Sequence, residues 1–230
     1  MKIDARNLSP DRRIALFDLG FRPFFLFAGI ASLLLMALWI YAYAQQGRLE
    51  FDYYYNAVTW HSHEMIFGYA GAVIAGFLLT AVRNWTGVQT TTGNALAGLV
   101  AIWLAGRIAP LFAGVLPHWV VAVVDTAFFP VLALALSVPL LRRGQKHNLV
   151  FLFVLTALTV ANLMVHLQIL GLTQTTASQG MYFAVYVIVF LIAIISGRVI
   201  PFFTETGMAG ATTRQWKPVE YIALGALIVL

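Results

Sequence analysis

Residues 58–82 read VTWHSHEMIFGYAGAVIAGFLLTAV, an apolar run long enough to cross a bilayer as one helix. Its first turns contain two histidines and a glutamate, His61, His63 and Glu64. Ionisable side chains within a membrane span are rare, usually face the protein interior and mark a functional site. Imidazole is also the commonest protein ligand for metals, and it suits iron, copper and zinc. The stretch therefore predicts a membrane helix that helps to hold a metal ion or a metal-bearing cofactor.

The composition extends the membrane assignment to the whole chain. Hydrophobic residues make up 61% of the 230 residues and charged residues 10%, whereas a soluble domain has about 25% charged residues. Six full spans are predicted: Phe24–Ala44, Val58–Val82, Ala95–Val115, Trp119–Leu141, Leu149–Gly171 and Met181–Phe203. A seventh apolar run begins at Val219 and continues to Leu230. The fold class is therefore an all-α, polytopic transmembrane helix bundle with six full spans and the start of a seventh.

Two segments are expected from this pattern. Residues 1–23 form a charged N-terminal segment on the cytoplasmic side, and residues 24–230 form the transmembrane helical domain. Because the last apolar run is cut off, we expect the chain to be the N-terminal portion of a longer membrane protein.

The basic residues lie where membrane topology needs them. One side carries those of the N-terminal segment and of the loops after the second, fourth and sixth spans: Lys2, Arg6, Arg12, Arg13, Arg22, Arg83, Arg142, Arg143, Lys146, Arg214 and Lys217. The other side has only Arg48 and Arg107. Because cytoplasmic loops are enriched in Lys and Arg, the N-terminus is predicted to be cytoplasmic. The net charge of +5 is then explained by basic loops on the cytoplasmic side of a lipid bilayer, and it does not indicate a nucleic-acid partner.

Four of the five histidines fall in the same, outer leaflet on this topology. His61 and His63 begin the second span, His118 begins the fourth, and His166 is near the end of the fifth. His147 lies in a cytoplasmic basic loop, where a solvated surface role is expected. Helix bundles form metal and cofactor sites from side chains, histidines among them, that converge from separate helices. The chain has no cysteine, which excludes thiolate ligands and iron–sulfur clusters.

Helical spacing limits which of these side chains can act together. His61 and His63 are two residues apart, so on a regular helix they point in different directions and would serve two sites or two flanks of one cavity. Asp125 aligns with His118, and Asn162 aligns with His166. Glu64, Asp125 and Asn162 are expected to orient ligating imidazoles through hydrogen bonds.

Simpler structural roles stay open for the same residues. A histidine beside Trp60 or Trp119 can anchor the helix at the membrane interface. Asp125 and Arg107 can neutralise each other within the outer leaflet. Arg198, near the cytoplasmic end of the sixth span, could hold an anionic group, although snorkelling to the interface is the simpler account.

Four sequence blocks resemble the NnrS family. They are FDLGFRPFF at 17–25, WHSHEMIFG at 60–68, GFLLTAVRNWTG at 76–87 and RVIPFFTE at 198–205. The resemblance implies a protein of about twelve spans in the bacterial inner membrane, of which this chain would be roughly the first half. It further implies a haem- and copper-containing protein of the response to nitric oxide and nitrosative stress.

The resemblance makes His61 and His63 the first candidates for metal ligands, because they occupy the family's His-x-His-Glu block. A haem is expected in the outer half of the bundle, with His61 or His63 as an axial ligand. His118 and His166 are further metal-ligand candidates from the leaflet argument, and His166 is also a candidate for cofactor binding. Met65 is a possible soft ligand for copper, and Arg107 is the candidate cation for the haem propionates. No catalytic residue is assigned.

Three classes of function remain open from the sequence. The first is a haem- and copper-binding protein that binds nitric oxide or protects against it. The second is a redox enzyme that turns nitric oxide over. The third is a metal-independent transporter with a His/Glu proton relay. Transporters often have spans broken by Gly or Pro at mid-depth, and the sequence shows no evident break of that kind.

Overall fold

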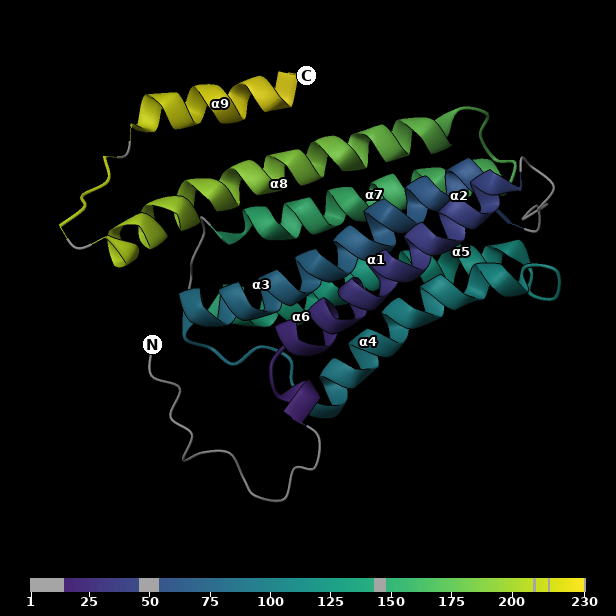
Figure 1. Ribbon diagram of the computed structural model, residues 1–230, viewed down its shortest axis with the longest axis horizontal. Helices are drawn as coiled ribbons and strands as arrows, with labels where there is room; N and C mark the ends of the chain where they lie inside the picture. Colours follow the sequence, from purple (N-terminus) through teal and green to yellow (C-terminus); the bar gives the residue numbers. More distant parts are fainter. Residues whose placement is uncertain (1–14, 46–53, 143–147, 209, 215, 230) are drawn as a thin grey trace. The chain divides into compact units, whose positions relative to one another are not determined.

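A computed structural model describes residues 15–45, 54–142, 148–208, 210–214 and 216–229. Its order of helices is η2 (Ala15–Asp18), α1 (Phe21–Ala44), α2 (Ala57–His63), η3 (Glu64–Ala70), α3 (Gly71–Thr86), α4 (Gly93–Ile108), η4 (Ala109–Phe112), α5 (His118–Thr126), α6 (Phe128–Arg142), α7 (Val150–Ile169), α8 (Thr176–Gly207) and α9 (Lys217–Val229). Figure 1 shows these helices along the chain. His147, Arg48 and most of the predicted basic N-terminal residues lie outside the described residues.

The predicted helical membrane fold is confirmed. Six helical segments within the described residues are long and apolar enough to cross a bilayer: Phe21–Ala44, Ala57–Thr86, Gly93–Phe112, His118–Leu141, Val150–Ile169 and Thr176–Gly207. Each overlaps one predicted span. The chain divides into two compact units, residues 1–147 and 148–230.

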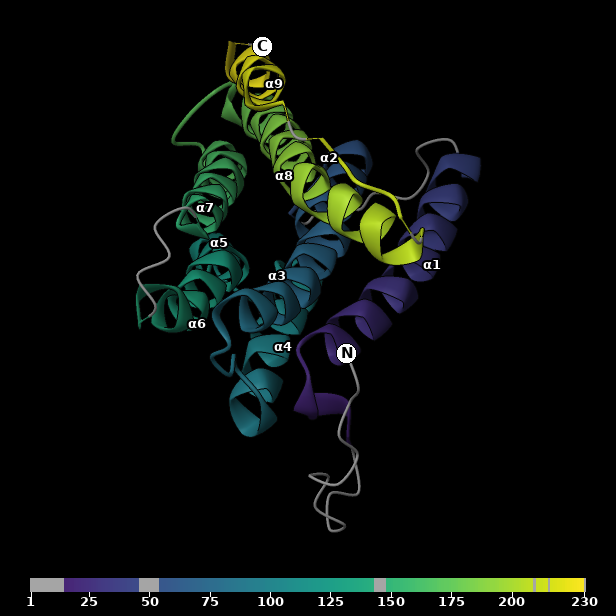
Figure 2. The same ribbon diagram turned by 90° about the vertical axis from the view of Figure 1, so that its left-hand side faces the viewer.

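The second span is the most enclosed of the six. It consists of α2, η3 and α3, which follow one another without a break (Figures 1 and 2), and 61% of its most apolar window is buried. Small residues allow α1 to approach it closely. A Cβ atom on Gly76 would lie 2.8 Å from the ring of Phe25, and one on Gly20 would overlap the Cβ of Leu79. Gly76 therefore lets α1 pack directly against the backbone of α3.

Two spans depart from the regular helices that the sequence predicts. In the second span, η3 is a π-helical segment that begins directly after His63. In the fourth span, Ala127 separates α5 from α6. A π-helical turn inserts extra chain into a helix and is frequent at functional sites. Gly68 lies inside η3 and Pro130 lies three residues after Ala127, but neither residue interrupts the apolar run, so hydropathy alone does not reveal these irregularities.

In the second unit, α7 and α8 form a close pair joined by a short connection (Figure 1). A Cβ atom on Gly180 would lie 2.5 Å from the carbonyl oxygen of Ala161, so only glycine allows this approach. The hydroxyl of Thr176 donates to the carbonyl oxygen of Met164 at 2.7 Å. The side-chain oxygen of Gln168 accepts from the backbone N–H of Ala177 at 2.8 Å and satisfies a donor in the first turn of α8.

Candidate metal centre

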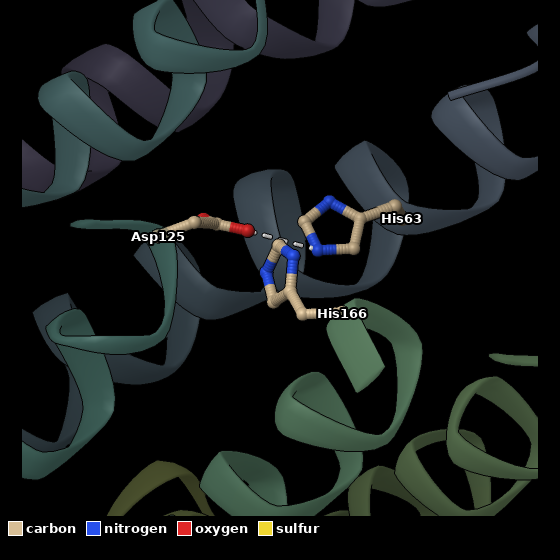
Figure 3. Close-up of side chains that lie close together, drawn as sticks. All are labelled: His63, Asp125 and His166. Carbon is tan, nitrogen blue, oxygen red and sulfur yellow. Dashed lines mark ion pairs between the residues drawn. The ribbon is translucent and has the colours of Figure 1, made fainter. Parts of the chain in front are cut away.

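His63 is the centre of a buried charged cluster in the first unit. It is the last residue of α2 and is fully buried. Its Nε2 lies 3.0 Å from Oδ2 of Asp125 on α5, and Figure 3 shows the imidazole and the carboxylate pointing toward each other. Its Nδ1 lies 3.3 Å from Oε1 of Glu64. Both ring nitrogens of His63 therefore face a carboxylate.

Tyr55 completes the surroundings of the His63 ring. Its hydroxyl lies 3.3 Å from Nε2 of His63, and its ring stacks on the imidazole with centroids 4.8 Å apart. Phe67, one turn further along, has its ring centroid 4.8 Å from the same imidazole. Burial raises the pKa of Tyr55 well above its ordinary value, and the charge of Asp125 raises it further. The Tyr55 phenol therefore stays neutral and serves as a hydrogen-bonding group.

Arg107 of α4 joins the two carboxylates from the other side. Its Nη2 forms an ion pair with Oδ1 of Asp125, and its Nε lies 3.3 Å from Oε2 of Glu64. The pairing of Arg107 with Asp125, which the sequence left open as a structural alternative, is thus present. The indole N–H of Trp103 donates to the carbonyl oxygen of Gly68 at 3.1 Å and ties α4 to η3.

Two glycines provide the space for these charges. A Cβ atom on Gly68 would lie 2.8 Å from both Nη1 of Arg107 and Oε2 of Glu64. One on Gly106 would lie 2.7 Å from Oδ1 of Asp125. A glycine in a membrane span ordinarily serves close packing between helices. In the structure Gly68 makes room for a guanidinium and a carboxylate instead.

The formal charges of the cluster do not balance without His63. Glu64 and Asp125 carry two negative charges when ionised, and Arg107 supplies one positive charge. Burying an uncompensated charge in a low-dielectric interior is costly. One further positive charge balances the cluster, either a proton on His63 or a bound cation beside it.

His61 and His118 have different surroundings from His63. The half-buried His61 stacks on Trp39 of α1, with centroids 4.4 Å apart and planes at 12°. Its Nδ1 is buried and has no hydrogen-bond partner among the described residues. His118 is exposed in the first turn of α5, with its ring edge-on to Tyr54 at 5.3 Å.

The side-chain partners expected from helical spacing therefore differ in part from the contacts in the structure. Asp125 was expected to align with His118, but it contacts His63 and Arg107. Glu64, which was expected to orient a ligating imidazole, lies beside the ring of His63. Tyr55 was not predicted, although its position directly before a span that begins with histidines was a usable signal.

Three further predicted site residues, Met65, Asn162 and His166, make none of the contacts described above for the cluster around His63. Met65 is half-buried in η3. His166 and Asn162 are both buried on α7, four residues apart in one continuous helix, and belong to the second unit. Figure 3 also draws His166.

A comparison with protein families covers most of the chain. Residues 15–230 match the family described as NnrS protein. The chain belongs to the NnrS family. All four blocks that resembled NnrS sequences lie within the matched range. No curated protein and no solved structure matches the chain.

The donor atoms around His63 in this NnrS-family chain suit a single metal ion. An imidazole nitrogen and a carboxylate oxygen face each other, and a phenol oxygen lies beside them. Nitrogen and oxygen donors of this kind bind Cu(II), Zn(II) and iron. A second carboxylate on the far nitrogen of a ligating histidine is the usual way to fix the ring and increase its basicity. Glu64 is in that position.

Proposed function

We propose that this chain is a haem- and copper-binding protein of the bacterial response to nitric oxide and nitrosative stress, acting in the inner membrane with its N-terminus in the cytoplasm. Membership of the NnrS family supports the physiological role. The observation that carries the metal-binding part is the His63 imidazole, which is held between two carboxylates inside a membrane span.

Copper fits the surroundings of His63. Glu64 at Nδ1 would orient the ring, so that Nε2 of His63 and the carboxylate of Asp125 would hold the ion. The hydroxyl of Tyr55 is a further oxygen donor or a hydrogen-bond partner for a ligand on the ion. The positive charge of the ion would replace the proton that balances the cluster, so metal binding here would release protons.

Haem does not fit at His63 in the observed arrangement. A macrocycle ligated at Nε2 would have to displace both Asp125 and Tyr55. His61 is the better candidate, because a buried ring nitrogen without a hydrogen-bond partner requires an explanation such as a missing ligand. Arg107 is held by two carboxylates, so we assign it to charge balance rather than to a haem propionate.

The haem iron would supply a binding site for the gas, tuned by its axial ligand and by the polarity of its distal side. Nitric oxide is small and apolar, and it reaches such a site from the lipid without a water-filled path. The chain's own contribution would be to hold the group, exclude water and present hydrogen-bond donors. His166 and Met65 remain predicted ligands on the sequence argument, whereas the exposed side chain of His118 disfavours the ligand role that the sequence suggested for it.

Metal and haem content of purified variants tests this assignment. Copper is measured by mass spectrometry and haem by its visible spectrum, reduced and oxidised, with and without nitric oxide. His63→Ala should lose copper and keep haem, whereas His61→Ala should lose haem and keep copper. His118→Ala is the matched control, because its side chain is exposed, and it should lose neither. His63→Ala protein with full copper content would contradict the copper assignment, and His61→Ala protein with full haem content would contradict the haem assignment.

A metal-independent transporter with a proton relay is the second candidate. The chain of titratable groups from Tyr55 through His63 to Asp125 favours it, because such groups form proton paths in membrane proteins. A colourless, copper-free preparation from cells replete in both haem and copper would support this alternative. A redox enzyme is distinguished from a binding protein by nitric oxide consumption in the presence of an electron donor.

A further inference from the structure

The cytoplasmic end of the sixth predicted span forms a cavity with two opposite charges. It has a volume of about 430 Å³ and is lined by Arg198, Pro201, Phe202, Glu205 and Thr213. All five residues belong to the second unit, so the cavity is independent of the cluster around His63.

Arg198 is positioned by two neighbours. Its Nη1 donates to Oδ1 of Asn148 at 2.6 Å. Its guanidinium carbon lies 5.3 Å from the ring centroid of Phe151, within the range of a cation–π contact. These contacts orient the guanidinium plane before any ligand binds. A planar, pre-oriented guanidinium is well suited to bidentate binding of a phosphate.

Glu205 is positioned separately at the other end of the cavity. Its Oε1 accepts from the backbone N–H of Thr213 at 2.9 Å and from the hydroxyl of Thr213 at 2.5 Å. Thr213 follows the end of α8, so this pair fixes the carboxylate against the next segment. Arg198 and Glu205 are seven residues apart on α8, which is about two turns and a rise of about 10 Å on one face.

The wall between the two charges is apolar. Pro201 has no backbone N–H, so the carbonyl oxygen of Gly197 lacks its usual donor within the helix. This carbonyl oxygen is therefore an additional hydrogen-bond acceptor near Pro201. Phe202 is 62% exposed and Trp216, beyond the helix, is 57% exposed. Exposed aromatic side chains at the end of a span are typical of the headgroup level of a bilayer.

We propose that this cavity binds the headgroup of a phosphatidylethanolamine lipid. The phosphate pairs with Arg198, the primary ammonium pairs with Glu205, and the start of the acyl chains lies over Pro201 and Phe202. A zwitterion accounts for both charges at the same cavity, whereas snorkelling accounts for Arg198 alone and the hydrogen bonds to Thr213 occupy only one oxygen of Glu205. The lipid headgroup and soluble phosphoethanolamine present the same two charged groups to the cavity. The exposed aromatic residues favour the lipid, because a soluble compound has no acyl chains to contact them.

Lipid binding to the purified full chain in detergent tests the proposal, measured by native mass spectrometry. Phosphatidylethanolamine should bind more tightly than phosphatidylcholine, whose quaternary ammonium has no N–H to donate, and than phosphatidylglycerol, which has no ammonium. Arg198→Gln should weaken binding of both phosphatidylethanolamine and phosphatidylglycerol by about tenfold or more, as expected for loss of a charge-assisted hydrogen bond. Glu205→Gln should abolish only the preference for phosphatidylethanolamine.

The controls separate recognition from folding. Arg214→Gln removes a neighbouring charge that stacks on Trp216 and does not line the cavity, so it should leave lipid binding unchanged. Arg198→Lys keeps the charge without the bidentate fork and should bind with intermediate affinity, even where Arg198→Gln fails to fold. Unchanged phosphatidylethanolamine binding by either Arg198 variant overturns the proposal. Equal loss of both lipids in Glu205→Gln overturns the pairing of Glu205 with the ammonium and with it the preference for phosphatidylethanolamine. Equal competition by soluble phosphoethanolamine overturns the lipid assignment.

Discussion

The ion pair between Arg107 and Asp125 depends on the absence of a side chain at Gly106. A Cβ atom there would lie 2.7 Å from Oδ1 of Asp125 and 3.2 Å from its Cα, which is backbone and cannot rotate away. Gly106→Ala should therefore separate α4 from α5 and destabilise the protein by about 1–3 kcal/mol. The measurement is the thermal unfolding midpoint in detergent.

Gly98→Ala is the matched control, because Gly98 lies on the same helix and a Cβ atom there meets nothing within 4 Å. Its midpoint should be unchanged or slightly higher, since alanine is the better helix former. Equal midpoints for the two variants would show that Gly106 is not needed for close packing.

Asp125 compensates two positively charged or chargeable groups at once. Asp125→Asn removes the negative charge from between His63 and Arg107 and leaves the guanidinium with Glu64 alone. Breaking a buried pair on one side costs about 3–5 kcal/mol. We expect the unfolding midpoint of Asp125→Asn to fall well below that of Glu220→Gln, a change of the same kind at an exposed position. A midpoint equal to that of Glu220→Gln would indicate that water or another group compensates Arg107.

The partners within the candidate site could be predicted only in part. His63, Glu64, Asp125 and Arg107 were all identified, because charge in a membrane span is conspicuous in an apolar sequence. Their pairing across helices was not, with the exception of Arg107 with Asp125. A membrane helix is apolar on all sides, so its hydrophobic pattern does not reveal which face meets which neighbour. Tyr55 was not predicted as a site residue, because a tyrosine at the membrane interface ordinarily serves as an anchor.

At the scale of helices, the six spans were predictable because bilayer thickness sets their length. The ends were less so. The sixth span was predicted as Met181–Phe203, but α8 extends over Thr176–Gly207, because its terminal turns are polar and leave the apolar run. The π-helical segment η3 was not predicted, since its residues have the same apolar character as a regular helix.

The π-helical segment sets the direction in which His63 points relative to α3. Deleting the half-buried Tyr69 should return η3 to α-helical spacing and rotate α2 by about 100° about the helix axis. His63 would then turn away from Asp125, so the unfolding midpoint should fall as in Asp125→Asn. Tyr69→Ala removes the same side chain without shortening the chain and should have a much smaller effect. Similar midpoints for the deletion and Tyr69→Ala would show that the extra residue does not determine the position of His63.

At the scale of the whole molecule, the distribution of charge predicts the orientation of every span. A cytoplasmic N-terminus places the loops after the first, third and fifth spans outside and those after the second, fourth and sixth inside. These 230 residues contain no cysteine, so a single introduced cysteine is the one thiol among them that a maleimide can label. Exposed loop positions are available for both predicted sides: Val115 and Leu172 for the outside, Gln89 and Thr212 for the inside.

Labelling of intact cells with a membrane-impermeant maleimide tests this orientation. Val115→Cys and Leu172→Cys should react at once, whereas Gln89→Cys and Thr212→Cys should react only after the membrane is permeabilised. The opposite pattern would place the histidine-bearing ends of the spans in the cytoplasmic leaflet and reverse the side from which a small ligand reaches His61 and His63. Labelling of Val115→Cys but not Leu172→Cys in intact cells would retain the outer position for the first unit. It would remove the argument that His166 lies in the same leaflet, because that argument requires the fifth span to end outside.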